Sequence, residues 1–379
     1  MATLIQERCA DTMPSAGGRF SVVLAGGGPA AVEAALAVQR IAGDRVTVTV
    51  VAPERHIHLP PTVLSPFAAG DHVRLPLDRL PGVNAHHGRM IAVDPAAREV
   101  RTSDGETLPY HALLVAVGAV QRSPFCRALA FGVPGSDERM HGLIQDLEDG
   151  YIKRVAFVVP VGNTWPLPVY ELALMTAARA YDMCDRVELT LVTPEPAPLA
   201  VFGDAVSRDV ARLLSEASIA IKTRARATMS RPNRIELRPS AEQLDVDRVV
   251  TVPVLDGHVI AGLPCDEAGF LPVDAHGRVD GIPGVYGAGD VTNFAIKQGG
   301  IACQQADAAA ETIAAAAGAE IEPAPFEPVL RGLLRTERDS LWMERHLGNA
   351  NSSNTLDGPR TNFAGRELSR LLLGILGRA

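Results

Sequence analysis

The sequence predicts an α/β protein with two parallel β-sheets, each built on a strand-helix-strand unit. The first unit begins with an apolar strand at residues 20–25, passes through three glycines and continues into an alanine-rich helical stretch at residues 30–41. A second apolar strand at residues 46–51 closes the unit. Continuous apolar runs of this kind are typical of strands buried inside a parallel sheet.

The same succession of elements returns about 130 residues further along the chain. There the strand is at residues 155–159, the helix includes residues 170–179, and the next strand is at residues 187–192. Strands that alternate with helices in this order predict parallel pairing, with the helices packed on the sheet. The repeat therefore predicts a second sheet of the same kind.

The segments around the two units have other patterns. Residues 87–112 alternate short apolar runs with turn signals, which predicts an antiparallel meander. Residues 113–117 predict another buried strand, and residues 300–317 predict a long alanine-rich helix. A proline-rich stretch at residues 322–328 marks a boundary before the tail.

Composition narrows the class of protein. A chain of 379 residues with 47% hydrophobic residues is too long for one core and predicts two or three domains. The net charge of −8 argues against nucleic acid as a partner. Five cysteines without a CxxC pair favour a reducing compartment and argue against a disulfide framework or a metal site. With neither a secretory signal nor a membrane-spanning run, we expect a cytoplasmic protein.

The glycine loop between the first strand and helix is the strongest functional signal. Gly26, Gly28 and Ala31 have the G-x-G-x-x-A spacing. The first glycine permits a tight turn, the second lets a pyrophosphate approach the backbone, and the alanine allows close helix packing. The helix N-terminus adds free N–H groups and a positive dipole end. We interpret the loop as dinucleotide-binding, the alternative being an ordinary glycine-rich turn.

Three further features accompany the loop. Glu54 is the nearest carboxylate after the second strand and the candidate for a ribose hydroxyl, the alternative being an exposed loop acid. Residues 287–290, Gly-Ala-Gly-Asp, follow an apolar strand and place a carboxylate where it can bond a sugar-alcohol hydroxyl. Residues 297–300, Lys-Gln-Gly-Gly, open a helix whose N-terminus would favour negative charge on a reduced ring.

This combination resembles the pyridine-nucleotide-disulfide oxidoreductase superfamily, in its branch of sulfide:quinone oxidoreductases and type II NADH dehydrogenases. The chain looks similar to bacterial FAD-dependent oxidoreductases that share FVVPVGNTWPLPVYELALM at residues 157–175, KQGGIACQQAD at residues 297–307 and LRGLL at residues 330–334. The resemblance implies two Rossmann-like domains of the glutathione-reductase type and a C-terminal cap. The FAD domain would be discontinuous, at residues 20–120 and 255–320.

The same resemblance implies an inserted NAD(P)-binding-like domain at residues 121–254 and a tail at residues 321–379. The residues expected to bind FAD are Gly26, Gly28, Pro29, Ala30, Glu54, Met90, Ala116, Gly118, Gly289, Asp290, Lys297, Gln298 and Gly299. Lys297 is also the candidate catalytic residue, as a charge near the flavin that tunes its reduced form; the alternative is a surface lysine.

The chain departs from its relatives in the second unit. Its three glycine positions carry Thr164, Pro166 and Val169, which hinder backbone approach and, at the proline, remove an N–H donor. Trp165 stands where sulfide:quinone oxidoreductases keep the first redox cysteine, and residues 321–379 contain no second one. We expect Trp165 and Pro166, with His58 at a rim, to shape the substrate side.

Two features bear on the electron acceptor and on membrane contact. Gln304 matches the second glutamine of the type II dehydrogenase quinone motif, while Gly300 replaces the first. Residues 366–378 have leucines at helical spacing, which suits a membrane surface, the chain's own domain or a second subunit of a homodimer. Peripheral contact with the inner membrane face is thus one of three expectations.

Three functions remain open from the sequence. The first is an FAD-dependent two-electron oxidoreductase that takes electrons from a small-molecule or sulfur-type donor and gives them to quinone or another acceptor. The second is an NAD(P)H-dependent flavin reductase of the type II dehydrogenase kind. The third is a flavoprotein that binds FAD mainly for structure or for a partner.

Overall fold

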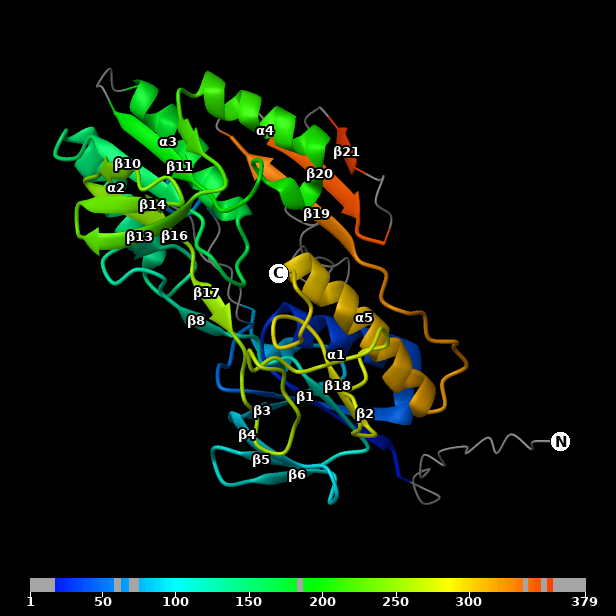
Figure 1. Cartoon of the computed structure of the whole chain (residues 1–379). Helices are drawn as coiled ribbons and strands as arrows, with labels where there is room; N and C mark the ends of the chain where they lie inside the picture. The colour runs from blue at the N-terminus through cyan, green and yellow to red at the C-terminus, as the bar shows by residue number, and fades with distance from the viewer. Residues whose placement is uncertain are drawn as a thin grey trace.

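The computed structural model of the chain describes residues 18–57, 63–67, 75–182, 187–336, 340–348 and 353–356. It contains two five-stranded parallel sheets and four smaller antiparallel ones (Figure 1). The predicted α/β class is therefore observed. Three single-turn 3-10 helices add to the elements described below: η1 (Gly43–Arg45), η2 (Leu77–Arg79) and η3 (Ala200–Phe202).

The first parallel sheet has the strand order β18-β7-β1-β2-β3. Its strands are β1 (Phe20–Ala25), β2 (Val46–Ala52), β3 (Val83–His87), β7 (Ala112–Val115) and β18 (Val285–Gly287). All strands run parallel, so their carboxyl ends meet at one edge. That edge carries both the glycine loop after β1 and the Gly-Ala-Gly-Asp run that begins in β18.

Helices α1 (Pro29–Ala42) and α5 (Gly299–Ala316) cover one face of this sheet and pack closely on each other (Figure 1). Their contact is made largely of alanines, whose small side chains allow the two backbones to approach. The opposite face packs on the meander β4 (Met90–Asp94), β5 (Glu99–Thr102) and β6 (Thr107–Pro109).

The second parallel sheet has the order β12-β11-β10-β16-β9. Its strands are β9 (Leu129–Ala130), β10 (Arg154–Val158), β11 (Glu188–Val192), β12 (Ala220–Lys222) and β16 (Arg248–Thr251). Its helices are α2 (Ser136–Glu148), α3 (Leu167–Asp182) and α4 (Asp204–Glu216), and a small sheet of β13 (Arg226–Arg231), β14 (Arg234–Arg238) and β15 (Gln243–Asp245) completes the unit.

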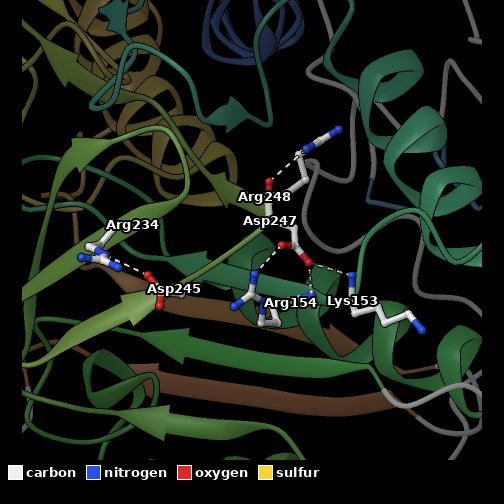
Figure 2. Close-up of polar contacts among 6 residues, drawn as sticks. All are labelled: Lys153, Arg154, Arg234, Asp245, Asp247 and Arg248. Carbon is white, nitrogen blue, oxygen red and sulfur yellow. Dashed lines mark hydrogen bonds and ion pairs between the residues drawn. The ribbon is translucent and has the colours of Figure 1, made fainter.

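Asp247 joins two strands at the amino end of the second sheet (Figure 2). Its carboxylate accepts hydrogen bonds from the backbone N–H of Lys153 and Arg154, each at 2.9 Å, and from the Arg154 guanidinium at 2.8 Å. The guanidinium and the two N–H groups lower the pKa of Asp247 to about 2. This edge lies opposite the carboxyl ends of the strands, so the cluster fastens β10 to β16 away from the functional end.

The two units are joined by the antiparallel pair β8 (Val120–Arg122) and β17 (Val254–Asp256). After α5 the chain forms a three-stranded antiparallel sheet of β19 (Val329–Arg335), β20 (Ser340–His346) and β21 (Ser353–Leu356). This C-terminal sheet lies beside α3 and α4 of the second unit and also contacts α5 (Figure 1). It thus reaches both units.

Several of these elements were not expected from the sequence. They include β3, α2, α4, the small sheet of β13 to β15 and the C-terminal sheet, which the tail was not predicted to form. The domain boundaries at residues 120/121, 254/255 and 320/321 remain predictions. The candidate tail helix at residues 366–378 lies outside the described residues.

Candidate functional site

The glycine loop after β1 is held against the end of β7. Gly26 donates its N–H to Val51 O at 2.9 Å and has φ +139°, a conformation that side chains rarely adopt. A Cβ placed on Gly26 would lie 2.2 Å from the backbone O of Ala116. Gly26 is therefore required by the close approach of two backbones, and Ala116, another predicted site residue, is the residue that approaches.

Gly28 differs from Gly26 because it has free space around it. Its backbone is extended, with φ −90°, and an added Cβ would meet no described atom within 4 Å. Pro29 is the first residue of α1, and the N–H groups of the following residues, starting with Ala30, have no acceptor within the helix. The open side of Gly28 next to these donors suits a pyrophosphate.

Gly289 brings the third motif to the start of α1. Its φ is +82°, and a Cβ there would lie 3.2 Å from the Cβ of Ala30 and 3.4 Å from that of Ala302. The Gly289 N–H donates to Gln305 Oε1 at 2.9 Å. Segments almost 260 residues apart therefore meet at the carboxyl edge of the first sheet, as the spacing of the motifs predicted.

Asp290 follows directly and is partly buried. Among the described residues no group donates a hydrogen bond to its carboxylate. Burial raises the pKa of Asp290, and the nearby Lys297 ammonium opposes that change. A half-buried acceptor without a donor is suited to a ligand that brings its own hydroxyl group.

Lys297 is buried, with 4% of its surface exposed. Its ammonium donates to the backbone carbonyls of Asp290, at 3.1 Å, and of Thr292, and lies 3.8 Å from the centre of the Phe270 ring. Burial lowers the pKa of Lys297 to about 8. The alternative of a surface lysine is thus not what the structure shows, but the charge points at carbonyls of its own loop.

Gln298 and Gly299 form the start of α5. The side-chain oxygen of Gln298 accepts the N–H of Ile301 at 2.9 Å and caps the helix, while its amide donates to Arg331 O of β19 at 3.4 Å. A Cβ on Gly299 would meet no described atom within 4 Å. The helix start is therefore open on the Gly299 side, and Gln298 contributes mainly its backbone there.

The remaining predicted residues lie around the same sheet. Glu54 is exposed, two residues beyond β2, and Met90 is buried at the start of β4. Gly118 follows β7 with φ +75° and open space where a Cβ would be. No hydrogen bond or ion pair among the described residues joins these three to one another. His58 lies outside the described residues.

Register shows which residues correspond in the two units. Gly26 N–H donates to Val51 O after β1, and Val159 N–H donates to Val192 O after β10, also at 2.9 Å. Three residues beyond these acceptors lie Glu54 and Glu195, each preceded by proline. Glu195 thus holds in the second unit the position of the ribose acid.

Glu195, unlike Glu54, is occupied within the protein. The Tyr170 hydroxyl donates to Glu195 Oε2 at 2.7 Å, and the Thr193 hydroxyl donates to the same oxygen at 2.8 Å. The Tyr170 oxygen also accepts the N–H of Leu199 at 3.3 Å. Burial raises the pKa of both Glu195 and Tyr170. The second ribose acid is therefore enclosed by α3 and by the chain that follows β11.

The start of α3 is also covered. Eight residues separate β10 from α3, whereas three separate β1 from α1. In that longer loop Trp165 packs edge-on to Phe202 at 5.9 Å between ring centres, and Pro166 is partly buried beside it. Gly332 of β19 lies against both Phe202 and Leu167, since a Cβ there would be 2.7 and 3.3 Å from their side chains. Side chains and β19 thus fill the region around the helix start.

Gln304, the residue matched to the quinone motif, has its amide in use. Its Nε2 donates to Gly300 O and Val329 O at 3.0 and 2.9 Å, and its Oε1 accepts the N–H of Val329 at 2.9 Å. It therefore connects α5 to β19. Both N–H donors of this side chain are thus used within the described structure, and neither is available to a quinone oxygen.

Sequence reasoning missed the Tyr170–Glu195 pair and the contacts of Gln305. The repeated Pro-Glu after the second strand of each unit, at residues 53–54 and 194–195, was a signal that could have revealed Glu195. Cys126 and Cys265 are exposed and Cys303 is buried, and none of these three is part of a disulfide. The part of the chain that the structure describes holds no group of metal-ligating residues and no helix long and apolar enough to span a membrane.

Comparisons with solved structures show the same fold. The sulfide:quinone oxidoreductase of Aquifex aeolicus superposes with a TM-score of 0.80 at 17% identity, over 89% of this chain and 87% of that one. The ferredoxin reductase of the CYP199A2 system of Rhodopseudomonas palustris superposes with a TM-score of 0.64 at 20% identity, over 85% and 81%. A NAD-dependent persulfide reductase from A. fulgidus reaches 0.60 at 17% identity, over 86% and 64%.

No curated protein matches the chain in sequence. The family model for pyridine nucleotide-disulphide oxidoreductase, however, matches residues 20–311, more than half of the chain. The matched region begins at β1 and ends within α5, and so includes both parallel sheets and every predicted site residue. The chain is an oxidoreductase of the pyridine nucleotide-disulphide oxidoreductase family.

Proposed function

We propose that this protein is an FAD-dependent two-electron oxidoreductase whose donor is a small molecule or sulfur species other than a pyridine nucleotide. The observation that carries the proposal is the contrast between the two units. In the first unit Gly28 leaves space for a ligand and Glu54 is exposed, whereas in the second unit Tyr170 donates to Glu195, the counterpart of Glu54.

The residues at the first sheet would divide the binding of FAD among them. The backbone at Gly28 and the start of α1 would bind the pyrophosphate, and Glu54 would accept from the ribose. Asp290 would accept from the sugar-alcohol chain. The start of α5, at Gly299, would place positive dipole charge near the flavin ring. FAD itself supplies the two-electron chemistry when bound.

Three features disfavour NAD(P)H as the dedicated donor. The second glycine loop is replaced by a longer one, its ribose acid Glu195 accepts two hydroxyl donors, and Gly332 covers the start of α3. A nucleotide would have to displace these contacts. The cysteine mechanism of sulfide oxidation is disfavoured too, because Trp165 holds the first cysteine position and residues 321–379 have no cysteine.

Quinone remains one of the proposed acceptors, but Gln304 gives it no support. A cytoplasmic location with peripheral membrane contact through residues 366–378 also remains a proposal. Co-sedimentation with vesicles of anionic phospholipid tests that contact. The full chain should sediment with the vesicles, and a chain that lacks residues 366–378 should stay in the supernatant.

Anaerobic titration of the purified holoprotein tests the function. We expect a yellow protein whose absorbance near 450 nm is not bleached promptly by NADH or NADPH, and is bleached by one of a panel of small-molecule and sulfur donors. Prompt bleaching by either nucleotide would instead establish the flavin reductase function. A protein that binds no added FAD would overturn the proposal as a whole.

The two corresponding acids provide a matched pair of variants. Glu54→Gln removes a charged acceptor and is expected to raise the FAD dissociation constant about 5–10-fold. Glu195→Gln keeps an oxygen for the Tyr170 hydroxyl and should leave FAD affinity unchanged. If Glu195→Gln weakens FAD and Glu54→Gln does not, the assignment of FAD to the first unit is wrong.

A further inference from the structure

The Lys297 ammonium closes the loop between β18 and α5. It lies at the end of that loop and donates to the backbone carbonyls of Asp290 and Thr292 near its beginning. The Phe270 ring, 3.8 Å from the ammonium, completes its surroundings. One side chain thus fixes the two ends of the loop relative to each other.

The first part of this loop, the turn from Gly289 to Thr292, is also held by contacts from Gln305 and Leu271. Gln305 Oε1 accepts the N–H of Gly289 at 2.9 Å, and its Nε2 donates to the Thr292 hydroxyl at 3.2 Å. The N–H of Leu271 donates to Val291 O at 2.9 Å. Every residue from Gly289 to Thr292 therefore makes a fixed contact through its backbone. In the middle of this turn, the Asp290 carboxylate alone accepts no hydrogen bond from a described residue.

Folding does not favour a charge at this place. Burial lowers the pKa of Lys297 to about 8, even though the carboxylates of Asp290 and Asp266 oppose the change. Removing water from the ammonium thus costs more than the surrounding charges return. A methionine of similar length would avoid that cost, but it would leave the carbonyls of Asp290 and Thr292 without their donor. The lysine therefore serves the turn whose carbonyls it binds, beside the buried carboxylate of Asp290.

We propose that Lys297 is a positioning residue, which holds the Asp290–Thr292 turn so that the Asp290 carboxylate can accept a hydrogen bond from the sugar-alcohol chain of bound FAD. The inference rests on the proposed binding of FAD at the first sheet. It assigns Lys297 an action through Asp290, in place of a direct contact with the flavin ring.

A double-mutant cycle on FAD affinity tests this role. We expect Lys297→Met and Asp290→Asn each to raise the FAD dissociation constant about tenfold, and the double variant to be no weaker than Asp290→Asn alone. Lys297→Met apoprotein should melt somewhat below the wild-type temperature, because the carbonyls of Asp290 and Thr292 lose their donor. Lys153→Met, an exposed lysine of the second unit, is the control and should change neither quantity.

The outcomes separate three explanations. Multiplied effects in the double variant, or a lower melting temperature of Lys297→Met with unchanged FAD affinity, would overturn the positioning role. A lower reduction potential of fully FAD-loaded Lys297→Met, with unchanged affinity, would show a direct charge effect on the ring instead. A wild-type protein that binds no FAD would overturn the proposed function, and this inference with it.

Discussion

Replacement of Gly28 by valine separates the cofactor role of the loop from its structural role. Gly28 has an extended backbone with φ −90°, which any residue adopts, and an added Cβ meets no described atom within 4 Å. The Cβ of a valine therefore meets no clash in the free protein. Its methyl groups would occupy the space through which a pyrophosphate approaches the start of α1.

The size of the effect follows from the donors that would be lost. The N–H groups of Ala30 and Ala31 lie at the start of α1, where a helix leaves them without an intrahelical acceptor. A hydrogen bond to a charged group is worth about 1.5–3 kcal/mol, so losing two of them costs about 3–6 kcal/mol. Each 1.4 kcal/mol is a factor of ten, so we expect Gly28→Val to weaken FAD binding at least about 100-fold.

Fluorescence titration of apoprotein with FAD, combined with urea unfolding of the free forms, measures both quantities. Gly28→Val should lose no more than about 1 kcal/mol, because Gly28 is the N-cap of α1 and valine is a poorer N-cap residue. Gly26→Ala should unfold at a lower urea concentration, with a free energy of unfolding smaller by more than about 2 kcal/mol, because its Cβ would lie 2.2 Å from Ala116 O. Gly142→Ala, inside α2 where a Cβ meets no described atom within 4 Å, is the control for a glycine without a steric role, and it should gain about 0.5–1 kcal/mol from helix propensity.

Two results would refute this reasoning. Binding of FAD by Gly28→Val within about threefold of wild type would show that no phosphate approaches there. Equal loss of stability in Gly28→Val and Gly26→Ala would show that Gly28, like Gly26, serves packing alone. A glycine pair two residues apart then carries one role and not two.

Other predictions concern stability. Asp247→Asn should cost about 1–2 kcal/mol in urea unfolding above pH 4, and the difference should vanish as the pH falls through about 2, because the folded pKa lies below the unfolded one. Burial raises the pKa of Asp307 to about 6, so ionisation of this carboxyl as the pH rises from 4 through 6 lowers the free energy of unfolding. Asp307→Asn, which does not ionise, should therefore be more stable than wild type at pH 7 by about 1–3 kcal/mol. A stability difference that does not change with pH would refute this. Gln304→Ala should cost about 2–3 kcal/mol because Val329 loses both backbone partners, and a variant of wild-type stability with a raised quinone KM would show that quinone binds there.

Much of the first sheet could be predicted because its signals are local. The strand at Phe20–Ala25 was predicted with the observed bounds, and α5 was predicted within a residue at each end. The edge strand β3 was missed because its side chains are mostly exposed and include two histidines, so its apolar pattern is weak. Its place in the sheet comes from pairing with β2, which is a long-range contact.

The site was predictable in its motifs but not in its contacts. Glycines and acids at set distances after strands are local patterns, and they brought Gly26, Gly28 and Asp290 to one edge. Side-chain contacts depend on geometry across the fold. Examples are the hydrogen bond from the Lys297 ammonium to a carbonyl of its own loop and the hydrogen bonds between Gln304 and Val329 of β19. No periodicity encodes such contacts, because an amide or an ammonium can serve either the protein or a ligand.

Glu54 and Glu195 show how this difference decides function. Both follow a proline at the same register position after the second strand of a unit, and their local sequences give the same expectation. In the second unit, Tyr170 on α3 reaches the acid and donates to it; in α1, Val32 lies the same three residues beyond Pro29 as Tyr170 lies beyond Leu167, and it has no hydroxyl to offer. One side chain on the helix thus determines whether the acid is left for a ribose or enclosed in the protein. If FAD binds at the first sheet as proposed, Glu54 is available to its ribose, whereas a nucleotide at the second sheet would first have to displace Tyr170 from Glu195.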